Sequence, residues 1–326
     1  MKKYSENAIN ILTVKTFEGK SLKWINDNLK GNESIQSLCR LLETHEYEFT
    51  KKRDKIEETI MKLSKDIDGL VALGDSAFPP FRGNVKSADR PVALFYKGEI
   101  NLLKKGNLNV AVIGVLNPDE KIKLSEKIVT AKILEYGATI ISGLALGCDS
   151  IAHETALENG GKTVAILPCA LNKVIPKENE NLAKDIVAKG GLLVSEYYEE
   201  PENWYSMTGR FVDRDRLQAL FSDAIVLAAS YTQKSAENWE SLKGQKLDSG
   251  SRHAMGKAEK YGITRAVIYN AEKHAGNPMF DLNRKLIEEQ KDIIIINHAN
   301  LVESVEKIIK RPTSKNKSAQ RDLEFE

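Results

Sequence analysis

The spacing of hydrophobic positions changes along the chain and divides it into two parts. Up to about residue 68 hydrophobic side chains recur at helical spacing, as at Ile9 and Leu12. Between Thr50 and Lys65 charges of both signs surround the hydrophobic positions, a pattern typical of a solvated amphipathic helix. We therefore expect residues 1–68 to form a small helical domain that serves docking or dimerisation.

Beyond this segment, short apolar runs alternate with amphipathic stretches. Continuous apolar strands separated by helices indicate an α/β fold with a parallel sheet covered on both faces. Strands are expected at 70–73, 92–96, 110–113, 138–141, 164–167, 192–194, 224–228, 266–269 and 293–296. Helices are expected at 122–136, 178–188, 214–221, 252–260, 282–289 and 301–309. Residues 231–249 form a polar insertion, expected to be a surface flap, and 311–326 form a polar, disordered tail.

A turn with two glycines follows the strand at 138–141. It reads Ser142-Gly143-Leu144-Ala145-Leu146-Gly147-Cys148-Asp149 and opens the helix that carries His153. Glycines allow close approach of a ligand to the backbone, and the amides at a helix start favour an anion. Asp149 suits the N-cap of that helix. A purely structural turn is the alternative.

Ligands of such sheets lie outside the carboxyl ends of the strands. This rule places the 142–149 turn, the turn at Gly114, Ser195-Glu196 and the 249–253 stretch on one rim. The rim is therefore the predicted binding site.

Composition limits where a ligand can be held. The 326 residues are 41% hydrophobic and 29% charged with a net charge of +2, so nucleic acid could be attracted only by a local patch. No apolar run approaches the length of a membrane span, and no signal sequence is visible. Cys39, Cys148 and Cys169 are scattered, which favours a reduced, cytoplasmic location without membrane contact.

Several motifs, in one order, resemble the DNA-processing protein A (DprA/Smf) family. They are the 142–149 turn with His153, the proline-asparagine turn 175–179, the strand end 191–196, the Arg-Asp-Arg element in 211–216 and Ser249-Gly250-Ser251. The resemblance runs from about Gly74 to Ile296. It implies an extended Rossmann-like fold over 69–310, binding of single-stranded DNA, a homodimer, and delivery of DNA to a RecA-type recombinase, with residues 1–68 available for that or another protein.

The chain also departs from the family pattern. The turn Gly114-Val115-Leu116-Asn117 lacks the usual Ser-Arg, Asp215 replaces the asparagine of Arg-Asn-Arg, and the 231–249 insertion is additional. These departures motivate an alternative function: a nucleotide-sensing or phosphoribohydrolase-like, nucleotide-hydrolysing domain of a defence or mobile-element system.

The predicted ligand contacts are glycines, hydroxyls and cations of the rim. They are Gly114, Ser142, Gly143, Leu144, Ala145, Gly147, Asp149, His153, Lys173, Lys177, Arg210, Arg214, Arg216, Ser249, Gly250, Ser251 and Arg252. Guanidinium groups match phosphate geometry, although Arg214 and Arg216 could instead form a solvated ion-pair cluster with Asp213 and Asp215. If the two arginines open a helix, one faces the rim and the other pairs locally.

Each remaining contact also has a structural alternative. His153 suits an orienting or packing role, Ser249 or Ser251 an ordinary N-cap, and Lys173 and Lys177 the ordinary surface. The aromatic group Tyr197, Tyr198, Trp204 and Tyr205 could stack on bases or pack in the core.

The sequence contains no Ser-His-Asp order, metal cluster or Walker loop. We therefore predict no catalytic residue, metal or cofactor. The primary hypothesis is a DprA-like single-stranded DNA-binding protein of DNA processing, recombination, natural transformation or antiviral defence.

Overall fold

The computed structural model describes residues 3–247 and 250–310, and its amino-terminal segment is helical. It contains α1 (Glu6–Lys15), α2 (Leu22–Asn28), α3 (Ile35–Leu42) and α4 (Glu46–Lys62). Ser5, Ser21 and Ser34 precede the first three helices, and each accepts a hydrogen bond from a first-turn amide that would otherwise lack a partner. The predicted tail at 311–326 and the predicted contact Ser249 lie outside the described residues.

A nine-stranded sheet forms the centre of the described chain. Its strands are β1 (Gly69–Ala72), β2 (Ala93–Gly98), β3 (Asn109–Ile113), β4 (Thr139–Ser142), β5 (Thr163–Ile166), β6 (Leu192–Ser195), β7 (Ala224–Leu227), β8 (Thr264–Ile268) and β9 (Ile294–Ile296). Their order is β1-β2-β6-β5-β4-β3-β7-β8-β9. The predicted Rossmann-like α/β fold is confirmed with one correction: β2 is antiparallel to both β1 and β6, so the sheet is not wholly parallel.

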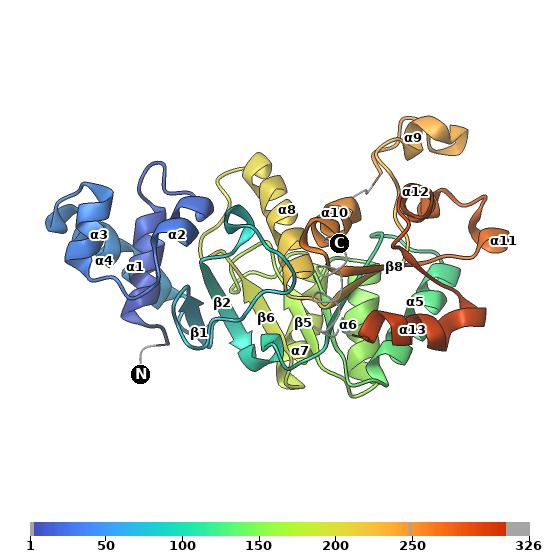
Figure 1. Cartoon of the computed structure of the whole chain (residues 1–326), viewed down its shortest axis with the longest axis horizontal. Coiled ribbons are helices and arrows are strands. Elements are labelled where there is room, and N and C mark those ends of the chain that lie inside the picture. Colours follow the sequence, from blue (N-terminus) through green and yellow to red (C-terminus); the bar gives the residue numbers. More distant parts are fainter. Residues whose placement is uncertain (1–2, 248–249, 311–326) are drawn as a thin grey trace, which may run out of the picture.

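Helices cover both faces of the sheet (Figure 1). On one face α5 (Glu120–Leu134) packs between α6 (Cys148–Glu158) and α13 (Leu301–Ile309), with α7 (Glu180–Ala188) beside α6. On the other, α8 (Trp204–Leu220) packs along α10 (Ser251–Tyr261). The remaining described helices are α9 (Ser235–Asn238), α11 (Ala271–His274) and α12 (Asp281–Glu289).

Helix α8 begins well before the predicted start at Arg214. Asn203 and Ser206 form a reciprocal capping box, in which the Asn203 side chain accepts from the Ser206 amide at 2.9 Å and the Ser206 hydroxyl lies 3.3 Å from the Asn203 amide. This pair fixes the helix start at Trp204. The arginines therefore lie in the middle of a long helix rather than at its beginning.

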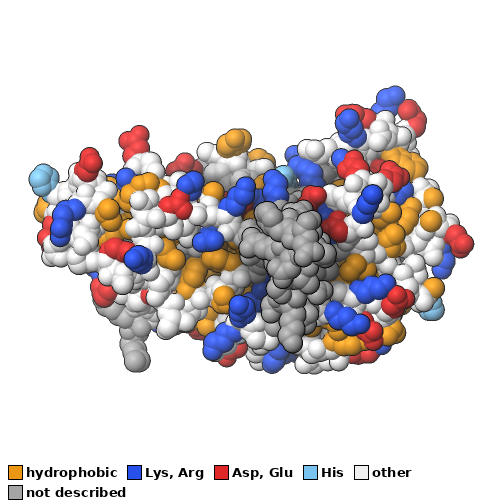
Figure 2. Space-filling view, in the orientation of Figure 1, with side chains coloured by type: hydrophobic (Ala, Val, Ile, Leu, Met, Phe, Trp, Pro, Cys, Tyr) orange, Lys and Arg blue, Asp and Glu red, His pale blue; other side chains and the backbone are white. Residues whose placement is uncertain are grey.

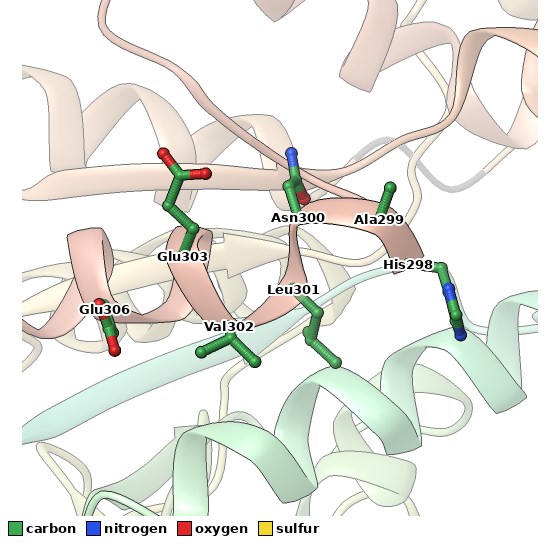
Figure 3. Close-up of a pocket in the computed structure, with 7 residues that line it drawn as sticks. All are labelled: His298, Ala299, Asn300, Leu301, Val302, Glu303 and Glu306. Carbon is green, nitrogen blue, oxygen red and sulfur yellow. The ribbon is translucent and has the colours of Figure 1, made fainter.

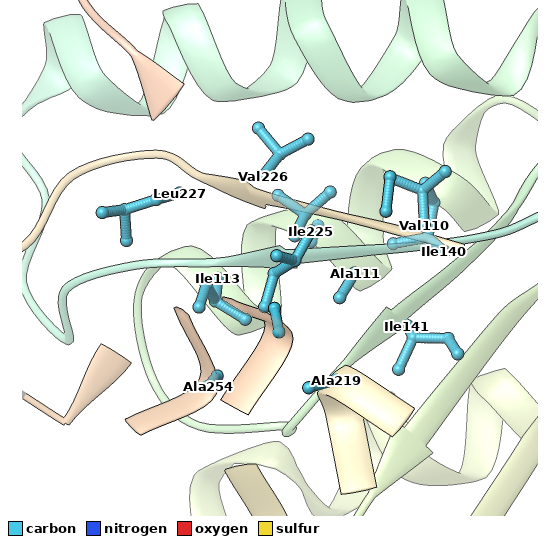
Figure 4. Packing of buried hydrophobic residues seen from close by; sticks show 14 of the residues in the cluster. Val110, Ala111, Ile113, Ile140, Ile141, Ala219, Ile225, Val226, Leu227 and Ala254 are labelled. Atoms are coloured by element: carbon cyan, nitrogen blue, oxygen red, sulfur yellow. The ribbon is translucent and has the colours of Figure 1, made fainter. Parts of the chain in front are cut away.

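Two hydrophobic clusters hold these layers together. One lies around the central strands, where Ile225 and Ile141 face small side chains of α8 and α10 such as Ala219 and Ala254, and Val226 points to the opposite face of the sheet (Figure 4). The other joins the interiors of α1–α4 to β1, β2, β5 and β6, through residues such as Phe49 and Phe95. The second cluster thus crosses the domain boundary expected after residue 68, and that boundary remains a prediction.

We expect Ile225→Ala to lower the free energy of unfolding by about 2–5 kcal/mol, because it leaves a cavity between two layers that cannot close over it. The Ile225 side chain is fully buried, and the residue is paired with Ala111 and Arg265 in the neighbouring strands. Urea unfolding would measure the change. Ile128→Ala, which truncates a side chain that is 42% exposed, is the control and should change stability little.

The described part of the insertion, residues 231–247, is attached to α12 by one carboxylate. Asp281 accepts from Ser235 Oγ at 2.5 Å and from Trp239 Nε1 at 2.9 Å, and it pairs with Arg284. The Arg284 guanidinium also lies 5.9 Å from the Trp239 ring centroid. The predicted surface flap thus has a defined attachment at its first half.

Candidate nucleic-acid interface

The direction of the crossovers reverses between β3 and β7, which lie side by side in the sheet. In open α/β sheets this reversal is where ligands bind, outside the carboxyl ends of the strands. The turn after β3 begins at Gly114, where a Cβ atom would lie 2.5 Å from Cys148 Sγ and 3.1 Å from the Ala229 carbonyl. Any side chain at position 114 would collide with the start of α6 and with the turn after β7, so only glycine fits there.

The start of α10 also contacts the turn at Gly114. Gly250 is its N-cap residue and makes no side-chain cap, so the expectation of an N-cap serine is wrong for Ser251. Ser251 is the first helical residue instead, and its hydroxyl donates to the Gly114 carbonyl at 3.3 Å. Arg252 follows it on the first turn, half-buried.

The central loop, residues 143–147, connects β4 to α6 and lies against the Gly114 turn. Gly147 has φ +75°, and a Cβ there would lie 2.3 Å from the Leu116 carbonyl. The Cys148 amide donates to the Val115 carbonyl at 3.1 Å. The two glycine-containing turns predicted on one rim are therefore in direct contact.

Asp149 does not cap its own helix, which corrects the sequence expectation. The N-cap is Gly147, and Asp149 Oδ2 accepts from the amides of Gly143 at 3.1 Å and Ala145 at 3.3 Å. The carboxylate thus holds the loop in front of the helix. It also occupies two amides that were expected to be available to a ligand.

Asn179 supports the loop from the other side, a role that the sequence predictions missed. Its side-chain amide donates to the carbonyls of Leu144 at 2.8 Å and Ala145 at 3.1 Å, and it lies 2.9 Å from Ser150 Oγ. Leu144 has φ +57°, a conformation that costs a non-glycine residue free energy. The only signal in the sequence was the proline-asparagine turn at 175–179, whose target on the loop could not be known.

Arg214 is brought to the loop by α8. Its Nη1 donates to the Gly143 carbonyl at 2.9 Å and to Asp149 Oδ2 at 3.3 Å, and its Nε lies 3.0 Å from Asp215 Oδ1. Within residues 3–247 and 250–310, its Nη2 contacts no acceptor. Nη1 therefore holds the loop and Nε faces Asp215, and Nη2 is the nitrogen of this 11% exposed side chain that has no acceptor among the described residues.

Arg216 lies inside the protein and pairs chiefly with a residue distant in sequence, so it forms neither a solvated cluster nor a purely local pair. Its side chain is 5% exposed and forms a buried ion pair with Glu196, also 5% exposed. Its Nη1 donates to the Asp89 carbonyl at 2.5 Å. Burial raises the pKa of the Glu196 carboxyl, and the adjacent guanidinium opposes that rise. Arg216 thus links β6 to the 87–90 turn and does not face the rim.

Ser142 and His153 also point inward. Ser142 Oγ donates to the Val112 carbonyl at 2.7 Å, and His153 Nδ1 lies 2.6 Å from Thr163 Oγ1. Because the Thr163 hydroxyl donates to the Ile140 carbonyl, His153 must be the donor and therefore carries its proton on Nδ1. Both side chains are fully buried, which fits the packing role considered for His153.

We expect stability to fall in mild acid because of His153. Burial, together with the Arg214 charge, lowers the pKa of its imidazole to about 3. Between this value and the unfolded value the unfolded chain binds the extra proton, so stability is lost as pH falls. The loss from pH 7 to pH 5 is about 2 kcal/mol. Urea unfolding at both pH values should show a smaller change for His153→Gln, whereas the exposed control His298→Gln should keep the wild-type dependence.

The remaining predicted cations lie at the periphery of the rim. Arg210 donates to the carbonyls of Glu199 at 2.7 Å and Glu200 at 3.2 Å, and its guanidinium stacks over the Tyr197 ring. Lys173 is exposed and pairs with Glu200 at 3.1 Å. Lys177 is exposed at the turn that carries Asn179. These groups form an outer positive margin beside the loop.

A separate hollow of about 430 Å³ lies at the start of α13 (Figure 3). It is lined by His298 and the following residues of the same segment, up to Glu306. None of the predicted contacts lies there, and two of its lining side chains are acidic. It therefore has no part in the rim site.

A family model described as DNA recombination-mediator protein A matches residues 69–236, slightly more than half of the chain. The chain belongs to this family. The match to the DNA recombination-mediator protein A family covers β1 to the start of the insertion, and so includes the central loop, Arg214 and Arg216. The family resemblance inferred from the motifs is confirmed.

Two relatives in the family are DNA processing proteins named DprA. The chain is 38% identical to the one from Streptococcus pneumoniae over 143 residues, which is 43% of this chain and 47% of that protein. It is 32% identical to the one from Bacillus subtilis over 141 residues, 43% of this chain and 45% of that protein. The aligned region therefore spans about half the length of these relatives.

Two solved structures of the family are also similar. The X-ray structure of DNA processing protein A from Streptococcus pneumoniae has a TM-score of 0.67 at 23% identity, covering 95% of this chain and 99% of that one, which supports the fold. That of DNA processing protein A from Helicobacter pylori, reported for its single-stranded DNA binding mode, has a TM-score of 0.52 at 27% identity over 71% of this chain and 98% of that one.

Within residues 3–247 and 250–310 no group of three or more His, Cys, Asp or Glu side chains could hold a metal ion. Over the same residues, no helix has the length and apolar character needed to cross a membrane.

Proposed function

We propose that this chain binds single-stranded DNA and contacts its phosphates at the carboxyl-end rim, around the central loop and Arg214. The observation that carries the proposal is the position of Arg214, which holds the loop with Nη1 and leaves Nη2 available beside it. A guanidinium held in this way is preorganised for a phosphate oxygen.

Backbone donors add to this site. In the described chain, the amides of Leu146 and Gly147, neither of which is buried, have no hydrogen-bond acceptor. They flank the start of α6, where the helix dipole favours negative charge. The single-stranded DNA binding of the Helicobacter pylori relative supports the same ligand class for this chain.

The acidic neighbours of Arg214 limit how many phosphates the rim can hold. Asp149 and Asp215 both lie beside it, so the local field is much weaker than that of a continuous basic groove. We therefore expect only about one to three phosphate contacts, and a slope of log affinity against log salt of about −0.7 to −2.

Fluorescence anisotropy with a labelled single-stranded oligonucleotide at two salt concentrations tests the proposal. Lys173→Ala with Lys177→Ala should weaken binding and flatten the salt dependence. The control Lys189→Ala removes an exposed lysine just before β6, at the opposite edge of the sheet, and should change neither. Salt-insensitive binding, or no binding, would contradict the proposal. In the latter case a thermal shift with nucleoside monophosphates would favour the nucleotide-binding alternative.

Protein partners form a further part of the proposal. We propose that the chain forms a homodimer and that residues 1–68 dock a RecA-type recombinase or another protein of recombination, transformation or defence. Tyr47 and Met61 of α4 are 79% and 60% exposed, which leaves apolar surface on this segment. Light scattering tests the dimer, and co-sedimentation with a recombinase filament tests the docking. A monomer that does not co-sediment would contradict both.

A further inference from the structure

We propose that Trp204, at the amino end of α8, is a base-stacking residue that extends the DNA path beyond the phosphate rim. This inference rests on the proposed function, since it adds a base contact to the same bound strand. Trp204 would stack on the base of a nucleotide adjacent to those whose phosphates are bound at Arg214.

The first observation is exposure. Trp204 is 74% exposed, and hydrophobic side chains project at the tip over the amino end of α8 (Figure 2). A large aromatic ring left in water gains free energy when a base stacks on it, whichever base it is, because every base has a π face.

The other aromatic residues of this region have structural partners. Tyr197 OH donates to Asp213 Oδ2 at 2.7 Å, and the Tyr198 ring packs against Phe95 with centroids 5.5 Å apart. The core-packing alternative therefore applies to these two tyrosines, and the exposed pair Trp204 and Tyr205 is left for a ligand.

Helical geometry separates Trp204 from its neighbour. Ten residues at 3.6 per turn place Trp204 about 80° from Arg214 around the helix axis, whereas Tyr205 lies about 180° from it. The rise over the same ten residues is about 15 Å, a span of a few nucleotides of an extended strand. Trp204 is thus nearly at right angles to Arg214 around the helix, whereas Tyr205 lies on the side directly opposite to Arg214.

The backbone that carries the ring is fixed. The Asn203–Ser206 capping box fixes the first turn, Met207 is buried, and the carboxyl half of α8 packs along α10. The same rigid helix therefore carries both the tryptophan and Arg214, so their separation is fixed before DNA binds.

Positive charge lies between the two along the helix axis. Arg210 is about 40° from Arg214 around α8, on the side away from Trp204, and its guanidinium is held by two carbonyls and the Tyr197 ring. Lys173, across from it, forms an exposed ion pair with Glu200, which a phosphate can replace at little cost. A strand that runs from Arg214 along α8 toward its amino end would bring its bases to the level of Trp204, about 15 Å along the axis.

The test compares two labelled oligothymidylates, of three and ten nucleotides, on the intact chain. Trp204→Ala should weaken binding of the ten-nucleotide strand roughly 5- to 150-fold, the range of one base–aromatic stack, and leave the three-nucleotide strand unaffected. Trp204→Phe should keep most of the affinity. Tyr205→Ala is the matched control, since Tyr205 is also exposed (89%) and lies opposite to Arg214 on the helix, and it should bind both strands like wild type.

Two results would overturn the inference, and they are distinguishable. If wild type binds both strands and Trp204→Ala binds the longer one equally well, Trp204 does not stack and the rim site stands. If wild type binds neither strand, the proposed function fails and the stacking role with it. Thermal unfolding of each variant confirms that the fold is retained.

Discussion

Arg216→Ala should lower the free energy of unfolding by about 3–5 kcal/mol, the cost of leaving one member of a buried ion pair without its partner. Arg216 and Glu196 are each 5% exposed, and the arginine also donates to the Asp89 carbonyl. Without the guanidinium, the burial that already raises the pKa of Glu196 loses its main opposing charge. Urea unfolding would measure the loss.

The pH dependence of the stability of Arg216→Ala tests whether the buried, unpaired Glu196 carboxylate causes the loss. A carboxyl whose folded pKa lies above its unfolded value binds its proton more readily in the folded state, so stability rises as pH falls through that window. The Arg216→Ala defect should therefore be smaller at pH 5 than at pH 8.

Two further variants serve as controls for the ion pair. Replacing both partners by apolar side chains, as in Arg216→Met with Glu196→Leu, should recover most of the stability. Lys184→Ala, which breaks the exposed pair with Glu180, should change stability by about 1 kcal/mol or less. An Arg216→Ala protein as stable as wild type would show that Glu196 finds another partner or water.

Gly143→Ala should weaken oligonucleotide binding at least about tenfold, or about 1.4 kcal/mol. A Cβ at this position would lie 1.6 Å from Arg214 Nη1 and 2.7 Å from Asp149 Oδ2. The guanidinium would have to leave the loop, and the site would lose its positioned cation and the hydrogen bond to the Gly143 carbonyl. Anisotropy measures the binding, and unfolding in urea should show a simultaneous loss of stability.

Gly209→Ala is the matched glycine control. Gly209 lies on the same helix as Arg214, and a Cβ added there would meet no atom of another element within 4 Å. Alanine should therefore raise stability by about 0.5–1 kcal/mol through helix propensity and leave binding unchanged. If Gly143→Ala bound DNA with full affinity, the position of Arg214 could not be what the phosphates require.

The arrangement of the rim could be predicted from short patterns in the sequence. Apolar runs of strand length, glycines at their ends and the carboxyl-end rule were enough to predict that Gly114, the central loop and the start of α10 meet. The structure brings these three together at the β3–β7 reversal.

The partners of individual polar side chains could not be predicted in this way. Arg214 and Arg216 are two residues apart in one helix, yet one reaches the loop and the other a buried glutamate that directly follows β6. Asp149 fits the local rule for an N-cap, but the backbone of Gly147 takes that position and the carboxylate turns back to the loop. Such choices depend on how distant elements pack, which spacing along the chain does not contain.

The left-handed residue of the central loop has a consequence for the choice of fragments. Leu144 is fully buried and belongs to the hydrophobic cluster that also contains the interiors of α1–α4. The burial of its side chain offsets its unfavourable backbone conformation. A fragment starting at residue 69 would open that cluster to water, so its failure to bind a ligand would report a relaxed loop rather than the properties of the intact rim.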